Sequence, residues 1–367
     1  MFDTTVQALS GLGAEQGLLL AARGDTLDAR VIVRFDSLPA TFVEGTDPAK
    51  PITFVDSATL RLLLDTLSIK GDFPLTIEAY DVDTTANDTS SAAVLALFRA
   101  DRLVTSQTFA HAELTDTITY VLPNSFVLAK AQNQQPLRLG LRTVSAGPSQ
   151  FLIYSTEAAK PPRLRFRVSP DTAIQAFSLA PRSKTPIDDA TAAANLADYT
   201  VFARRPAPAG ASELALGGFP PQRALFRFDI PTSILDSSTI IRATLLLNRV
   251  PHGNLDPDDS VFVITSVVMA GTAVTDPTKA AQIFADAGID TLRTTAGESG
   301  PAIIELGRAF LLWRSLDASE TPRAIVLHAR GEGTSPLEVR FSSVEAAAAL
   351  RPRLRISYTN EVPLGLP

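Results

Sequence analysis

Arg223-Ala224-Leu225-Phe226-Arg227-Phe228-Asp229 is the stretch of sequence that decides the fold, because it occurs twice. The other occurrence is Arg30-Val31-Ile32-Val33-Arg34-Phe35-Asp36, and both read R-x-x-x-R-F-D. Short runs of apolar, β-branched and aromatic residues bounded by charged residues favour β-strands over helices. Two copies of one such strand in a chain of 367 residues indicate an internal duplication.

The duplication extends beyond this strand, and its members keep their order along the chain. Two further pairs of segments are similar: Ala58–Leu64 with Ala243–Leu247, and Pro162–Arg167 with Pro352–Ser357. The spacing drifts by only a few residues between the copies, as insertions in surface loops produce. We therefore predict two homologous domains, residues 4–168 and residues 198–359, and the length of the chain agrees with two domains.

A connector is predicted between these domains, over residues 169–197. It contains three prolines and ends in an alanine-rich run. Prolines with small polar residues favour a semi-rigid linker over a folded element, and residues 188–195 are expected to form one short helix at most. Residues 360–367 hold two prolines and are predicted to form an extended C-terminal tail.

Alternation of apolar and polar residues is the dominant secondary-structure signal. Leu164, Phe166 and Val168 face one way while three arginines between them face the other, which is typical of an antiparallel sheet with one wet face. We predict an all-β protein with two tandem antiparallel β-sandwich, jelly-roll-like domains joined by a Pro/Ala-rich linker. Strands are expected near 5–9 and at 29–35, 59–64, 75–80, 117–121, 137–142, 151–155, 163–168, 224–228, 243–247, 261–267, 324–329, 337–342 and 351–358, with helical turns at 278–287 and 305–313.

Composition excludes several classes of site. Hydrophobic residues make up 45% of the chain and charged residues 20%, which is typical of a globular protein. The net charge of -6 disfavours nucleic acid as a partner, because duplex binding needs a basic surplus. The absence of cysteine excludes disulfides, thiolate nucleophiles and iron–sulfur clusters. Three histidines far apart in sequence, and no G-x-S-x-G motif, leave little for nucleophilic catalysis, so we predict no enzyme.

Membrane and export signals are not visible in the sequence. No apolar run reaches the roughly 18–20 residues of a membrane helix, so no transmembrane segment of its own is predicted. The N-terminus lacks a basic region followed by an apolar core, so the given sequence holds no signal peptide. Either the protein is cytoplasmic or its numbering starts at a processed or recombinant end.

Four segments of the second copy form a recognisable pattern: Arg223–Ile230, Ile240–Leu247, Ile304–Trp313 and Arg351–Ile356. In this pattern, residues 198–359 resemble the DNRLRE-type bacterial β-sandwich domains. The first copy shares the opening and the end of the pattern. It has Phe126 and Leu128 at the place of the short helical turn that bears Trp313 in the second copy. Neither copy spells DNRLRE itself. The resemblance implies a non-catalytic module of exported or cell-envelope proteins, and hence an extracytoplasmic location: periplasmic, cell-surface or secreted.

An acidic loop after a predicted strand is the candidate metal site. It offers four oxygen-bearing side chains: Asp81, Asp83, Asn87 and Asp88. Ca²⁺ takes 6–8 oxygen ligands, and such a loop supplies several of them, although the glycine and the distal glutamate of an EF-hand are missing. The alternative interpretation is a solvated turn without metal. No other cofactor is predicted.

Two arginine ladders form the candidate binding surface. They are Arg163, Arg165 and Arg167 in the first copy, and Arg351, Arg353 and Arg355 in the second. Guanidinium groups on one sheet face bind carboxylate or sulfate groups in a bidentate manner. The alternative is cross-strand pairing with Asp and Glu on neighbouring strands.

A non-catalytic structural or interaction protein fits these observations best. We expect an accessory or scaffold subunit that binds other protein subunits in a cell-envelope, membrane-complex or extracellular assembly. The alternative is a carbohydrate-binding module that recognises a polysaccharide, anionic ones included. One Trp and five Tyr against 19 Phe favour core packing over sugar stacking, and Trp313 is expected in the core.

Overall fold

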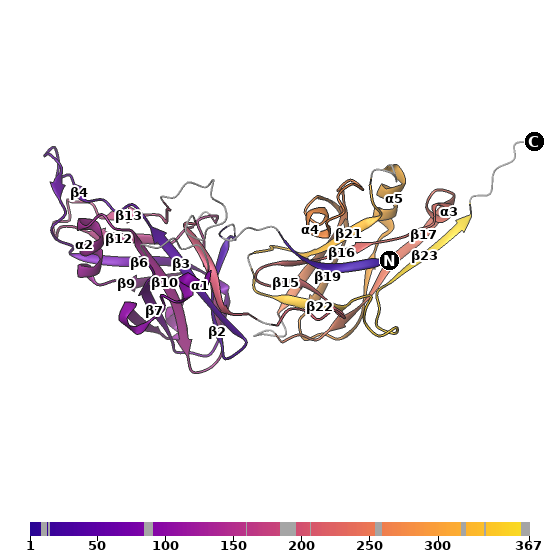
Figure 1. Ribbon diagram of the computed structural model, residues 1–367, viewed down its shortest axis with the longest axis horizontal. Helices are drawn as coiled ribbons and strands as arrows, with labels where there is room; N and C mark the ends of the chain where they lie inside the picture. Colours follow the sequence, from indigo (N-terminus) through magenta and orange to yellow (C-terminus); the bar gives the residue numbers. More distant parts are fainter. Residues whose placement is uncertain are drawn as a thin grey trace, which may run out of the picture. The chain divides into compact units, whose positions relative to one another are not determined.

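The computed structural model describes residues 1–8, 13, 15–83, 91–158, 160–183, 196–205, 207–253, 259–316, 321–333 and 335–360. These residues form large antiparallel sheets with a few short helices, so the prediction of an all-β fold is confirmed (Figure 1). The chain divides into two compact units. Unit 1 consists of Met1–Ser10 and Pro208–Pro367, and unit 2 consists of Gly11–Ala207.

Unit 2 is built on one sheet with the strand order β13-β12-β6-β11-β2-β3-β10-β7-β8, where β14 also pairs with β3 and β9 with β6. The strands are β2 (Gly17–Arg23), β3 (Leu27–Phe35), β6 (Ser57–Gly71), β7 (Leu75–Asp81), β8 (Leu103–Phe109), β9 (Thr117–Val121), β10 (Leu137–Ser145), β11 (Ser149–Tyr154), β12 (Arg163–Arg167), β13 (Phe177–Leu179) and β14 (Asp198–Arg204). A small hairpin joins β4 (Thr41–Phe42) to β5 (Lys50–Pro51), and the helices are α1 (Ser91–Leu95), η1 (Ala100–Arg102), η2 (His111–Glu113) and α2 (Asn124–Gln132).

Unit 1 is built on a second sheet with the order β19-β18-β21-β16-β15-β22-β17-β20, where β1 also pairs with β16 and β23 with β17. Its strands are β1 (Phe2–Gln7), β15 (Glu213–Gly217), β16 (Gln222–Arg227), β17 (Ser238–Val250), β18 (Ser260–Val268), β19 (Phe284–Thr295), β20 (Gly300–Glu305), β21 (Ala324–Ala329), β22 (Glu338–Ser342) and β23 (Arg353–Asn360). Its helices are α3 (Thr232–Leu235), α4 (Pro277–Ala280) and α5 (Gly307–Ser315).

The two sheets have the same strand order. The path β8-β7-β10-β3-β2-β11-β6 in unit 2 corresponds to β19-β18-β21-β16-β15-β22-β17 in unit 1. The strands β9 and β12 pair with β6 as β20 and β23 pair with β17. In sequence, α2 lies between β9 and β10 as α5 lies between β20 and β21. The R-x-x-x-R-F-D stretches therefore occupy the same central strand of each sheet, β3 and β16.

These central strands are buried on both faces. Val31, Val33 and Phe35 of β3 lie in the main core of unit 2, whereas Ile32 packs on the outer face with Tyr80 and with residues of β14. In unit 1, Ala224 and Phe226 of β16 lie in the main core, and Leu225 packs in an outer cluster. Strands that are apolar on both faces read as continuous apolar runs, which is why this stretch stands out in the sequence.

Each sheet curls, so that strands from its two ends meet. The carboxylate of Asp290 on β19 accepts a hydrogen bond from the N–H of Glu305 on β20 at 2.8 Å. At the matching place in unit 2, the side chain of Gln107 on β8 accepts from the N–H of Val121 on β9 at 3.3 Å. The result is a sandwich-like body with one main apolar core per unit.

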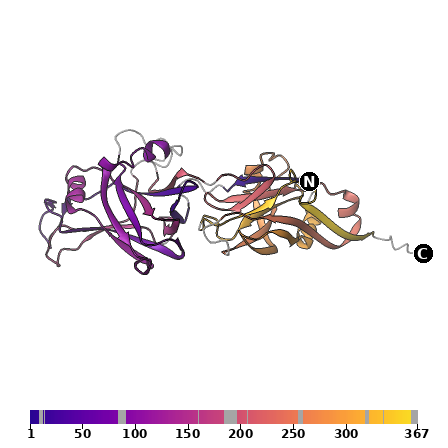
Figure 2. The ribbon, with the colours of Figure 1, turned by 90° about the horizontal axis from the view of Figure 1, so that it is seen from below.

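Two segments pair with another unit than the predicted domain boundaries give them. The segment from residue 4 is predicted to belong to the first domain, but β1 pairs with β16 of unit 1. Both views show this indigo strand, which ends at the N label, among the strands of unit 1 (Figures 1 and 2). The strand β14 from residue 198 pairs with β3 of unit 2. The physical reason is the same in both cases, because a central strand buried on both faces needs its edge N–H and C=O groups paired.

The predicted linker, 169–197, also contains structure. The strand β13 pairs with β12, and the prolines permit this because they lie on either side of Phe177–Leu179. Residues 184–195, which include the expected short helix, lie outside the described residues, as do residues 361–367 of the predicted tail. Asn360 belongs to β23.

The helix predicted at 305–313 is confirmed, with α5 at Gly307–Ser315. The helix predicted at 278–287 is wrong beyond its first turn. Asp276 caps α4 by accepting from the N–H of Thr278 at 2.9 Å, but Phe284 already pairs with Val268 as part of β19. Sheet pairing overrides local helix propensity at this point.

Trp313 provides a test of the core of unit 1. Its side chain is fully buried between Phe228 and Phe310. We expect Trp313→Ala to lower the free energy of unfolding by about 3–5 kcal/mol, because a large core cavity is left. On the same helix, Leu311 is 68% exposed, and Leu311→Ala should change it by no more than about 0.5 kcal/mol. Urea denaturation followed by circular dichroism checks both values, and equal effects would contradict the packing described.

Candidate functional site

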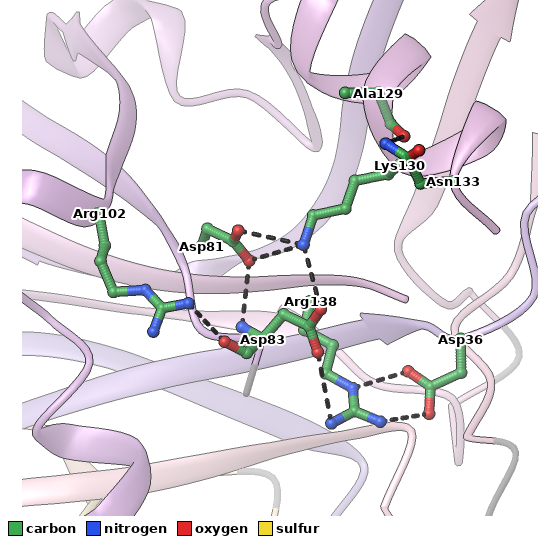
Figure 3. A network of polar contacts seen from close by, with 8 residues as sticks. All are labelled: Asp36, Asp81, Asp83, Arg102, Ala129, Lys130, Asn133 and Arg138. Atoms are coloured by element: carbon green, nitrogen blue, oxygen red, sulfur yellow. Dashed lines mark hydrogen bonds and ion pairs between the residues drawn. The ribbon is translucent and has the colours of Figure 1, made fainter. Parts of the chain in front are cut away.

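The first candidate, the acidic loop, holds cationic side chains between its carboxylates. Nζ of Lys130, on α2, lies 3.1 Å from a carboxylate oxygen of Asp81 and 3.1 Å from one of Asp83 (Figure 3). The ammonium group is almost fully buried, and both carboxylates are largely shielded from solvent. The backbone N–H of Asp83 also donates to Asp81 at 3.1 Å.

A second cation continues this network. The guanidinium of Arg138 binds both carboxylate oxygens of Asp36 at 2.9 Å, and lies 3.7 Å from Asp83. The side chain of Arg102 donates to the backbone carbonyl of Asp83 (Figure 3). Asp36 is the last residue of the R-x-x-x-R-F-D stretch, so the network fixes the end of β3 to the acidic loop and to α2.

Half of the predicted calcium ligands can be placed. Asp81 and Asp83 are brought together, with the ammonium of Lys130 between them. Asn87 and Asp88 lie outside the described residues. Within the described part of the chain, no group of three or more His, Cys, Asp or Glu side chains is arranged to hold a metal ion. Calcium binding here stays a prediction, and it would require Ca²⁺ to displace Lys130.

The second candidate is the arginine ladder of unit 2. Arg163 and Arg165 are exposed on β12, and Arg163 lies directly opposite the exposed Arg61 of β6. Among the described residues, none of these three guanidinium groups has an acidic side chain within ion-pair distance. Arg167 donates to the backbone carbonyl of Asp171 at 2.9 Å. These described arginines therefore do not form the cross-strand ion pairs with Asp or Glu that the alternative predicts.

The ladder of unit 1 occupies the matching strand. Arg353 and Arg355 are exposed on β23, and Arg355 lies opposite Thr244 as Arg165 lies opposite Thr59. Arg355 lines a hollow of about 180 Å³ together with Arg242 and Ser357. Arg242 forms an ion pair with Glu305. Arg351, outside the strand, donates to the carbonyl of Ala346, and Arg353 donates to that of Ala348.

His328 has packing contacts inside unit 1. His328 stacks on Phe284, with ring centroids 5.0 Å apart, and its Nε2 lies 3.2 Å from the hydroxyl of Ser266. Ser266 is fully buried, so a substrate has no access to that hydroxyl. Burial also lowers the pKa of His328.

Two buried carboxylates, which sequence reasoning missed, hold β1 and β14 in place. The carboxylate of Asp3 on β1 accepts from the N–H of Val344 at 3.0 Å. Asp198 on β14 accepts from the N–H of Thr156 at 2.9 Å and from its hydroxyl at 2.8 Å. Val344 and Thr156 occupy matching places, because each is the middle residue of a Ser-x-Glu segment that begins directly after β22 or β11: Ser343–Glu345 and Ser155–Glu157.

A threonine two residues on completes each of these contacts. The hydroxyl oxygen of Thr5 accepts from the N–H of Ala215 at 3.0 Å, and that of Thr200 accepts from the N–H of Leu19 at 2.9 Å. We call each Asp–Thr pair a strand clasp. The signal in the sequence is the repeated D-x-T-V of Asp3–Val6 and Asp198–Val201, which is too short to stand out.

Burial perturbs both clasp carboxyls. It raises the pKa of Asp198 to about 7, with the nearby charges of Glu157 and Glu15 acting in the same direction and the hydrogen bonds from Thr156 opposing. Burial also raises the pKa of Asp3 to about 6. Strongly perturbed carboxyls mark functional sites in many proteins, but these two bind backbone groups inside the fold.

Comparison of the chain with known protein families gives no matching family model, and a search of the curated proteins gives no match. The resemblance to DNRLRE-type domains therefore stays a prediction. Over the described residues, the structure contains no helix with the length and apolar character to cross a membrane.

Lys130→Met tests the buried network. We expect it to lower the free energy of unfolding by about 1–3 kcal/mol, because Asp81 and Asp83 then lose the ammonium between them and Arg138 remains beside Asp83 alone. Lys50, whose ion pairs with Glu44 and Asp47 are exposed, is the control, and Lys50→Met should change the value by about 0.5 kcal/mol or less. Chemical denaturation measures both, and equal stabilities of the two variants would contradict the network.

Asp198→Asn tests the clasp through pH. Because the pKa of Asp198 is about 7 in the folded protein and about 3.9 when unfolded, the native state binds the extra proton between these values. The stability due to the neutral carboxyl is present below about pH 4 and is lost as pH rises through 7. Between pH 4 and pH 8, the free energy of unfolding of wild type should therefore fall by on the order of 2–4 kcal/mol relative to that of Asp198→Asn. Asp25→Asn, at a fully exposed carboxyl, should follow wild type, and parallel curves for all three proteins would rule the effect out.

Proposed function

We propose that the protein is a non-catalytic scaffold or accessory subunit that binds acidic surfaces of other protein subunits through its arginine ladders. It consists of two tandem, homologous jelly-roll-like sandwiches and works in an extracytoplasmic assembly of the cell envelope or the cell exterior. The proposal extends the resemblance to DNRLRE-type domains, and the equal strand order of the two sheets supports the duplication on which it rests.

The observation that carries this proposal is the uncompensated positive charge of three arginines, Arg61, Arg163 and Arg165. Like charges placed opposite each other on neighbouring strands destabilise a sheet, and no described acidic side chain neutralises these three. The chain as a whole carries a net charge of -6, so this arginine-bearing face of the sheet is positively charged on a protein that is acidic overall. Guanidinium groups bind carboxylates in a bidentate manner, and a partner with Asp and Glu side chains supplies them.

The alternative is a carbohydrate-binding protein that recognises an anionic polysaccharide. The hollow beside Arg355 favours it, because about 180 Å³ lined by Arg242, Ser357 and Arg355 suits one carboxylate or sulfate group. The aromatic side chains argue against it, because Trp313 is buried in the core and sugar stacking needs exposed rings.

Charge reversal of the unit 2 ladder tests the function. The partner is first identified by native mass spectrometry of complexes isolated from the source cells with the tagged protein. We expect Arg163→Glu/Arg165→Glu to weaken its binding at least about tenfold, with a strong dependence on salt. The control Arg99→Glu/Arg204→Glu makes the same change in net charge at two exposed arginines elsewhere in unit 2, and its affinity should stay near that of wild type.

The same variants separate the two candidate functions. The alternative replaces the scaffold proposal if the protein is isolated without stoichiometric protein partners and binds a sulfated or uronic-acid polysaccharide. The double variant must then lose this polysaccharide binding. Unchanged binding of the protein partner by Arg163→Glu/Arg165→Glu would refute the assigned surface.

A further inference from the structure

The two units exchange their first strands along the chain. The strand β1 precedes the first repeat, which begins with β2, yet it pairs with β16 of the second repeat. The strand β14 precedes the second repeat, which begins with β15, yet it pairs with β3 of the first. We call β1 and β14 the anchor strands. Each unit is therefore completed by the anchor strand of the other repeat.

The anchor strands occupy equivalent positions in the same register. Asp3 lies opposite Phe226 and Asp198 lies opposite Val33, which are matching residues of the two R-x-x-x-R-F-D stretches. Both strand clasps bind backbone N–H groups at matching places, as described above. The valine that follows each clasp, Val6 or Val201, is buried in the outer apolar cluster of its unit. We call the groove that receives this D-x-T-V sequence the slot.

Each anchor strand takes the free edge of its central strand. Asp28 and Ala29 of β3 pair with both β14 and β2, and Gln222 of β16 pairs with both β1 and β15. Because one residue of a ladder pairs with one strand on each edge, the anchor strand lies on the edge away from β2 or β15. Only segments 8–16 and 205–212 separate each anchor strand from the repeat that follows it, yet each pairs with the other repeat.

Each slot therefore holds the anchor strand of the other repeat of the same chain. A second molecule of this protein carries the same anchor strand. We propose that unit 1 binds the anchor strand β1 of a second copy of this chain, so that the protein self-associates by strand exchange. The exchanged form keeps every clasp and ladder contact, because the same residues meet. It differs mainly in effective concentration, and since the whole of unit 2 lies between β1 and β16 in the chain, no short connection favours the closed form. Exchange of an identical element between copies is a low-cost route to assembly.

Single cysteines test this in the full-length protein, which has no cysteine of its own. Gln7 lies opposite Gln222, and Phe2 lies opposite Arg227, at the two ends of the β1–β16 ladder. Chains with Gln7→Cys or Phe2→Cys are each mixed with differently tagged chains that have Gln222→Cys or Arg227→Cys. The mixtures are incubated at about 0.5 mM, so that the β1 strands of other copies compete with the chain's own β1, and then oxidised.

In-register pairs should give disulfide-linked heterodimers at least about fivefold more often than crossed pairs, because a disulfide needs Cα atoms within about 7 Å. Crossed pairs, such as Gln7→Cys with Arg227→Cys, share the same strands and report random collision. Each variant is first shown to melt as wild type does. Equal yields for in-register and crossed pairs, or no heterodimer at all while Gln7→Cys/Gln222→Cys closes within one chain, would overturn strand exchange between copies.

Discussion

The pairing of the edge of the central strand is the constraint on which the rest of the structure depends. The strands β3 and β16 are apolar on both faces, so their backbone groups lie deep inside each unit and water does not reach them. An unpaired N–H or C=O group in such a place costs as much as a lost hydrogen bond. One edge of each central strand pairs with β10 or β21 and, at its first residues, with the hairpin partner β2 or β15. The anchor strands pair with the other edge.

The central strands themselves could be predicted from sequence, because being buried on both faces produces a continuous apolar run. The partners of these strands could not. D-x-T-V is four residues long, and the groups that it binds, such as the N–H of Val344, are backbone atoms that leave no trace in the sequence. The strands β8 and β19 were also missed, because they lie at the ends of the sheets and are largely polar on one side.

For the candidate sites, too, one part of the arrangement could be predicted from the sequence and another part could not. Alternation along β12 and β23 predicted which arginines are exposed, since the period of a strand decides the face of each side chain. Which charges face the acidic loop could not be predicted, because Lys130 and Arg138 reach Asp81 and Asp83 from α2 and β10, far along the chain. Ion pairs between distant segments depend on the tertiary fold, and a single sequence holds no record of them.

Interstrand contacts of the anchor strands test the central claim most directly. Nuclear Overhauser effects between Hα protons identify which strands are antiparallel neighbours, because the Cα atoms of such pairs lie about 4.5–5.5 Å apart. The account predicts contacts of β1 with β16, across Asp3–Phe226 and Thr5–Ala224, and of β14 with β3, across Asp198–Val33 and Thr200–Val31. Contacts of β1 with β3 and of β14 with β16 would show that each repeat keeps its own first strand, and would contradict the account.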